Sequence, residues 1–334
     1  MDTAKLDCIV QSVLYEGYLL YPYRQATKNV KRWTFGSIYP RESREVRDGA
    51  ERCQTRARCL VVGPAHAQLA AEIRFLHLIE RRSTSEQEMA APCWHECIER
   101  RVPIELRDLG QLSAAGYRQP FQFPQARWSE PADRSSEPAV VARRQAGLQG
   151  LVEIKATAPA PDVHLLSITI SNESSSAVEA TARPCAQGED ALLQSLASAH
   201  LVLGVQGGEF VSRFDPPDAY RDLLQTDPGD GLWPVLVGEE GQRHTLLCSP
   251  IILYDYPGLA PESAGDFFDA TEIDEMLTLR IMTLADDEKR AMAALDARGR
   301  ALLDRTQNMA ERQLAQLHGA MRSTRTIQEP RHGQ

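Results

Sequence analysis

Alternating apolar and polar positions predict strands over most of the first 260 residues. ARCLVVG (57–63) is a short apolar run with β-branched residues, bounded by polar segments. In AEIRFLHLIERR (71–82), apolar Ile73 and Phe75 alternate with polar Glu72. This stretch fits a helix or a strand, and its β-like neighbours favour the strand.

Residues 8–40 predict a β-hairpin. CIVQSVLYEGYLLYPY (8–23) is rich in β-branched and aromatic residues, and VKRWTFGSIYP (30–40) alternates imperfectly. The polar segment QATKN (25–29) lies between them and suits a turn. Pro22 should end the first strand or place it at a sheet edge.

Further strands follow in the middle of the chain, separated by loops rich in Pro, Gly and Ser. We expect strands within 140–158, 163–174, 201–214, 233–238 and 244–257, a helix over 189–200, and a loop over 128–138. The glycines of GVQGG (204–208) are followed by Glu209 and do not open a helix after a lysine. They therefore indicate a turn or β-bulge and not a phosphate-binding loop.

After residue 260 the period changes to that of a helix. Thr271 and Asp274 resemble a helix-capping box. An apolar stripe follows at Met292, Leu295, Leu302, Leu303 and Met309. The predicted fold is α+β and mostly β. It has a β-sandwich-like or open-barrel body over 1–260 (with a possible subdivision near 128–138), a helical C-terminal arm over 261–320 and a frayed tail over 321–334.

Charge narrows the classes of partner. The 334 residues carry a net charge of −9, which disfavours nucleic acid, because phosphate binding needs a basic face. The charge is uneven: residues 1–60 hold 11 basic and 7 acidic side chains, and residues 181–334 hold 14 and 24. This asymmetry suits contacts within the fold or two distinct surfaces.

The sequence predicts a cytoplasmic protein. The N-terminal residues have the pattern of neither a signal peptide nor another targeting segment, and no apolar run is long enough to span a bilayer. The seven cysteines are odd in number and scattered, as is typical of a reducing compartment.

Candidate chemistry is sparse. Cys93, His95 and Cys97 have side chains that bind zinc, but no second cluster with ligand spacing accompanies them. Buried cysteines with a surface histidine explain them better. The acidic cluster Asp266, Asp269, Glu272, Asp274 and Glu275 could hold a hard cation, yet acids at a helix start already complement its dipole. No G-x-S-x-G elbow occurs, and we expect no catalytic residue and no cofactor.

Two tracts carry a family resemblance. They are YEGYLLYPYRQATKNVKRWTFGSIYPR (15–41) and a discontinuous one made of GGEFVSRFDPP (207–217), WPVLVGEEG (233–241) and the segment that begins with SPIILYDYPGLAP (249–284). Together they resemble an uncharacterised bacterial family whose genes often lie in nickel–iron hydrogenase clusters. The resemblance covers about a third of the chain and implies a genomic context without a chemistry.

These observations favour a non-enzymatic accessory protein that binds a hydrogenase subunit or maturation factor. The expected contact residues are Tyr18, Tyr21, Tyr23, Arg24, Lys28, Trp33, Asp255 and Tyr256. Tyrosines near cations suit an interface because their rings bury well while the hydroxyl keeps a polar partner. The alternatives are a metal-binding protein or enzyme that uses the cysteines or the acidic cluster, and a structural protein that self-associates through its C-terminal helices.

Overall fold

The computed structural model describes six stretches of the chain and a few residues after them. The stretches are 3–14, 36–83, 94–131, 140–175, 189–225 and 229–258, and the later residues are 282, 286, 289, 300, 303, 304 and 306–308. The chain divides into two compact units, Met1–Gly258 and Leu259–Gln334. The elements below all belong to the first unit.

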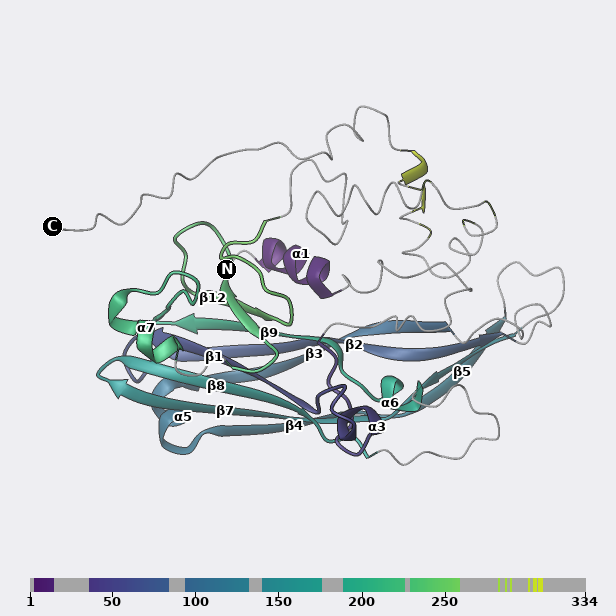
Figure 1. The fold of residues 1–334 in the computed structure, drawn as a ribbon, viewed down its shortest axis with the longest axis horizontal. Coiled ribbons are helices and arrows are strands. Elements are labelled where there is room, and N and C mark those ends of the chain that lie inside the picture. The colour runs from purple at the N-terminus through teal and green to yellow at the C-terminus, as the bar shows by residue number, and fades with distance from the viewer. Residues whose placement is uncertain are drawn as a thin grey trace. The chain divides into compact units, whose positions relative to one another are not determined.

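The fold is mostly β and contains two antiparallel sheets (Figure 1). The five-stranded sheet has the order β10(Glu209–Phe210), β1(Gln54–Val62), β8(Val163–Asn172), β7(Leu148–Ala160) and β4(Tyr117–Phe123). Its outer strands are short. In the centre β1 pairs with β8 along its whole length, and β8 pairs with β7 with one register shift between Thr157 and Ala160.

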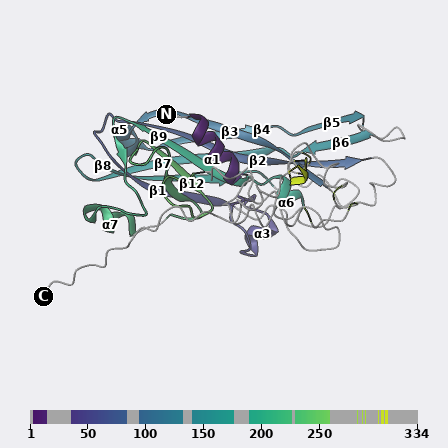
Figure 2. The same ribbon diagram turned by 90° about the horizontal axis from the view of Figure 1, so that it is seen from above.

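The seven-stranded sheet is built around one long strand, β2(Gln68–Ser83). One edge of β2 pairs with β3(Trp94–Asp108), and the other edge pairs first with β9(Ala197–Gln206) and then with β6(Val140–Gln145). β5(Ala126–Pro131) extends the sheet beyond β6, and β12(Thr245–Ser249) with β11(Trp233–Leu236) extends it beyond β9. β5 and β6 lie at the right-hand end of the ribbon in Figure 2.

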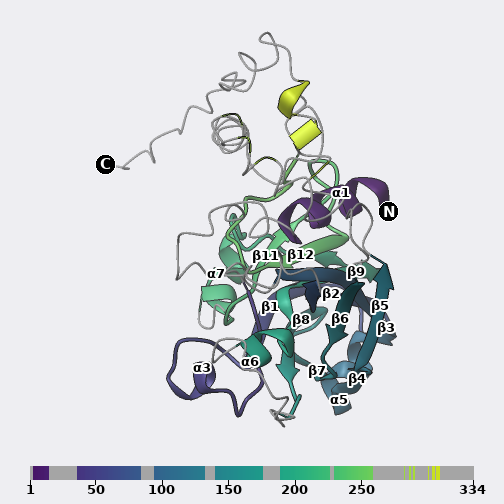
Figure 3. The ribbon, with the colours of Figure 1, turned by 90° about the vertical axis from the view of Figure 1, so that its right-hand side faces the viewer.

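The two sheets form a sandwich-like body with one shared core. Alternate side chains of β1, β7 and β8 meet alternate side chains of β2 and β9 in a single apolar cluster. Phe75 and Phe210 are the largest fully buried side chains in it. The end-on view separates the layers (Figure 3). The predicted mostly-β, sandwich-like class is therefore confirmed.

Short helices accompany the sheets. They are α1(Thr3–Leu14), α3(Arg44–Arg47), α5(Leu109–Ala115), α6(Glu189–Leu193) and α7(Asp218–Gln225). α7 packs on the outer face of β1, where Leu224 joins Leu60 and Val211 in a separate apolar cluster.

The N-terminal strand prediction is wrong for residues 8–14. These residues belong to α1, which lies on the outer face of the seven-stranded sheet (Figure 1). Leu6, Ile9, Val10 and Val13 recur at helical spacing and are buried. The β-branched residues suggested a strand, but the period of the buried positions decides for a helix.

Two further predictions need correction. Residues 126–131 form β5, so the predicted loop over 128–138 begins within a strand, and residues 132–139 lie outside the described part. The helix predicted over 189–200 ends at Leu193, and a strand begins at Ala197. Every residue from 197 to 203 is buried, so the apolar residues of this stretch belong to a sheet strand and not to one face of a helix.

The turn prediction for GVQGG agrees with the structure. Gly207 has φ of +77° and Gly208 follows it, so the chain leaves β9 and enters β10 in the other sheet.

Candidate functional site

A tight turn beyond β10 is fixed by side-chain hydrogen bonds. The Ser212 hydroxyl oxygen accepts hydrogen bonds from the backbone N–H groups of Phe214, at 3.1 Å, and Asp215, at 3.0 Å. The same hydroxyl donates to the Asp255 carboxylate. The other carboxylate oxygen of Asp255 accepts from the backbone N–H of Leu236 at 2.8 Å. Asp255 thus joins this turn to the end of β11.

Three large apolar side chains project from this scaffold, and we call them the apolar patch: Phe214, Ile252 and Tyr254. They are 55%, 72% and 71% exposed. The Phe214 and Tyr254 rings meet edge-on, with centroids 5.0 Å apart and planes at 77°. An exposed aromatic pair held by a braced turn has the composition of a protein-binding surface.

A pocket of about 400 Å³ lies beside the patch. Its lining residues come from the Ser212 turn, α7 and β11: Arg213, Phe214, Asp215, Pro216, Arg221, Leu224, Gln225 and Trp233. The Arg213 guanidinium lies 5.3 Å from the centre of the Trp233 ring. Arg221 pairs with Asp218 at 2.7 Å. The pocket offers an aromatic wall and cationic groups next to the exposed rings.

Two of the predicted contact residues are described, and both have structural partners. Asp255 braces the turn as above. Tyr256 packs against the main core, and its backbone N–H donates to the Leu236 carbonyl at 2.7 Å. The other six, Tyr18, Tyr21, Tyr23, Arg24, Lys28 and Trp33, lie outside the described residues. A role for these eight residues in partner binding stays a prediction.

Sequence reasoning missed the apolar patch. A signal was present, because the second resemblance tract is discontinuous. Its segments 207–217, 233–238 and 249–258 converge on this one surface. The exposure of Ile252 and Tyr254 could not be predicted, because SPIILYDYP (249–257) has the composition of a buried strand and the strand ends at Ser249.

His95 and Cys97, proposed as weak metal ligands, lie on one face of β3. His95, opposite Glu80, is buried and not at the surface as expected, and Cys97, opposite Leu78, is half-buried. Cys93 lies outside the described residues, as does the acidic cluster 266–275. Within the described part of the chain, no three His, Cys, Asp or Glu side chains gather as a metal site would require.

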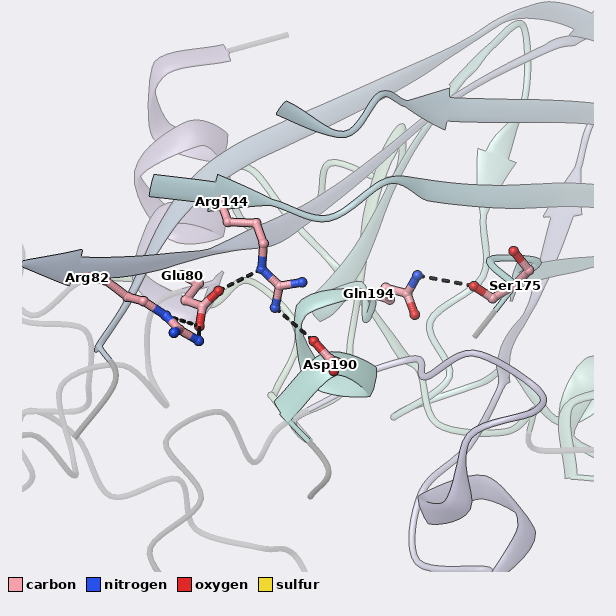
Figure 4. Close-up of polar contacts among 6 residues, drawn as sticks. All are labelled: Glu80, Arg82, Arg144, Ser175, Asp190 and Gln194. Carbon is pink, nitrogen blue, oxygen red and sulfur yellow. Dashed lines mark hydrogen bonds and ion pairs between the residues drawn. The ribbon is translucent and has the colours of Figure 1, made fainter. Parts of the chain in front are cut away.

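Glu80 is instead part of an ion-pair network (Figure 4). Its carboxylate, only 4% exposed, accepts from Arg82 Nε at 2.7 Å and from Arg144 Nε at 2.6 Å. Arg144 continues to Asp190 at the start of α6 at 2.8 Å. Because two guanidinium groups already neutralise Glu80, this carboxylate is a poor metal ligand.

Buried nucleophiles and bases are held in unreactive forms. Burial raises the pKa of Cys59 to about 12 and that of Cys248 well above its ordinary value, so both stay protonated thiols near neutral pH. Burial lowers the pKa of His77 and of His200 to about 4, which keeps both imidazoles neutral. The Nδ1 atom of His200 lies 2.7 Å from the Ser198 carbonyl oxygen, and its Nε2 atom lies 3.3 Å from the Ser249 hydroxyl oxygen.

Comparison with known proteins gives no family for this chain. It matches no family model, no curated protein and no solved structure. Among the described helices, none has the length and apolar character needed to cross a membrane.

Proposed function

We propose that this chain is a non-enzymatic cytoplasmic accessory protein that binds another protein through the apolar patch. The observation that carries the proposal is the exposure of Phe214, on the turn that Asp255 braces, and of Ile252 and Tyr254, in the segment just before Asp255. Large aromatic side chains, held rigid before binding, lose little conformational freedom in a complex.

We further propose that the partner is a nickel–iron hydrogenase subunit or a maturation factor. Support comes from the resemblance, whose second tract supplies all three residues of the patch. The pocket beside the patch, with Arg213 against Trp233, would accept an acidic or aromatic side chain of that partner.

A pull-down with matched variants tests both parts. Tagged full-length chain would be purified from a bacterium that expresses a hydrogenase gene cluster, and its companions identified by mass spectrometry. The test variant is Phe214→Ser with Tyr254→Ser. The control is Leu106→Ser, which removes an exposed apolar side chain, 44% exposed, from β3.

We expect a hydrogenase component with the wild type and the control, and at least tenfold less with the double variant. If the double variant retains that component fully, the apolar patch is not the binding surface. If no hydrogenase component accompanies the wild-type protein, the proposed partner is wrong.

A further inference from the structure

The outer face of the five-stranded sheet carries rows of cations and hydroxyls. Strand register places Arg58 of β1 opposite Ser167 of β8, and Ser167 opposite Lys155 of β7. Neighbouring strands lie about 4.8 Å apart, so the backbones of the two cations are about 10 Å apart, with one short side chain between them. Two long side chains therefore flank a small hydroxyl.

The adjacent row repeats the arrangement with one acid. Arg56 lies opposite Thr169, and Thr169 lies opposite Glu153. Glu153 pairs with Arg118 of β4 at 3.1 Å. The acid of this row is therefore shared with a fourth cation at the sheet edge.

These two rows line part of an open pocket of about 290 Å³. Its lining is Arg56, Arg58, Glu153, Lys155, Ala156, Thr157, Leu165, Ser167 and Thr169. Liquid water occupies about 30 Å³ per molecule, so the pocket has room for about ten waters. That exceeds one tetrahedral oxyanion and leaves space toward Leu165, an apolar side chain that also packs in the α7 cluster.

The charge of the pocket differs from that of the whole chain. Three cations and one carboxylate are among its lining residues, whereas the chain carries a net charge of −9. Guanidinium groups form paired hydrogen bonds to the oxygens of a phosphate, an ammonium adds a point charge, and hydroxyls donate to the remaining oxygens.

We propose that this pocket binds a phosphate group between Arg58 and Lys155, above Ser167. Thr169 and Arg56 reach the same group from the adjacent row. The phosphate would come from a phosphorylated small molecule, whose carbon skeleton lies toward Leu165, or from free phosphate. This site is separate from the apolar patch and does not depend on the proposed partner.

Isothermal titration of the full-length chain at low ionic strength tests the site. The probes are inorganic phosphate, adenosine monophosphate and glucose 6-phosphate, with sodium chloride at equal ionic strength as the reference. The test variant is Arg58→Gln with Lys155→Gln. The control, Arg41→Gln with Arg47→Gln, removes the same charge from exposed positions near α3.

The expected result is binding of at least one phosphate probe that weakens tenfold or more in the test variant and less than twofold in the control. Tighter binding of an organic phosphate than of inorganic phosphate supports the small-molecule source, and the reverse supports free phosphate. Equal weakening in both double variants, or no phosphate binding by the wild type, overturns the proposal.

A third variant keeps the test decisive if the double variant fails to fold. Glu153→Gln removes the carboxylate from the pocket wall, and its partner Arg118 is 69% exposed. Phosphate affinity should rise about threefold, because a repulsive charge near the anion is lost. An unchanged or lower affinity contradicts the placement of the phosphate.

Discussion

On the outer face of the seven-stranded sheet the buried carboxylate of Glu80 meets two guanidinium groups. On the five-stranded sheet two rows place cations beside hydroxyls, and one of these rows also holds Glu153, which pairs with Arg118. Glu80 bonds to Arg82 and Arg144, and all these groups are matched within the fold. Arg58 and Lys155 flank Ser167. Charges of both signs in adjacent positions stabilise a sheet, whereas cations next to hydroxyls supply the donors that an anionic ligand uses.

The outer faces of the two sheets also differ in whether other elements cover their charged side chains. α1 lies on the seven-stranded sheet, where Asp7 pairs with Arg74 at 2.6 Å and the Arg74 side chain is 4% exposed. Lys155 on the other sheet is exposed. Four predictions test how far this difference between the two faces extends.

The largest effect is expected for Glu80→Gln. This change leaves Arg82 and Arg144 without their shared anion, and breaking such a buried pair costs about 3 kcal/mol of unfolding free energy. Urea unfolding would measure the loss. The control is Glu105→Gln, where the carboxylate is 79% exposed and pairs with Arg107. Its change should stay below about 1 kcal/mol. Similar losses in both variants would contradict the distinction.

The second prediction concerns His200, which lies opposite Arg74 beneath the covered face. Its pKa of about 4 is below the ordinary value of 6.5. As the pH falls below 6.5, His200 becomes protonated in the unfolded chain, whereas in the folded chain it stays neutral until about pH 4. His200 should therefore lower the free energy of unfolding by about 1 kcal/mol for each pH unit in this window, in addition to the contribution of His77. Urea unfolding from pH 7 to 4.5 should show that the unfolding free energy depends less steeply on pH in His200→Asn than in the wild type. An unchanged pH dependence would rule out His200 as a source of this loss of stability.

A smaller effect is expected for Asp7→Ala. Asp7 is 34% exposed, so water screens its pair with Arg74, and the expected loss is about 1 kcal/mol. The substitution should raise the amide exchange rate in α1 more than in β9 beneath it. Asp48→Ala is the control, because that carboxylate pairs with Arg44 at an exposed surface. Unchanged exchange in α1 would show that apolar packing alone holds the helix.

The smallest effect is expected on the five-stranded sheet. Lys155→Gln should change the unfolding free energy by less than about 0.5 kcal/mol, since the side chain is exposed. The same variant should weaken phosphate binding. A loss of stability comparable to that of Glu80→Gln would mean that this row is structural.

Much of the fold could be predicted from periodicity. The alternation around Ile73 and Phe75 identified β2, and the apolar runs identified β1, β8 and β11. Residues 8–14 have the composition of a strand, but the spacing of Leu6, Ile9 and Val10 is that of a buried helix face. Local sequence also could not show that the chain changes sheets at Gly207, since that depends on which distant strand offers a free edge.

The candidate sites were less predictable. Exposure of Phe214 and Tyr254 depends on the turn that Ser212 and Asp255 build together across 43 positions of sequence. The phosphate pocket depends on register, because Arg58, Ser167 and Lys155 become neighbours only when three strands align. Neither arrangement leaves a local motif.

The length of β2 has a consequence for the order in which the protein can assemble during synthesis. β3 follows β2 directly and can pair with it early, but Gln68–Leu76 meets β9 on its other edge only after residues 197–206 have been made. Until then that edge presents unpaired backbone groups, which other chains can join. Closing so long a loop also slows folding. The nascent chain is therefore open to aggregation through this edge during the synthesis of the stretch between β3 and β9.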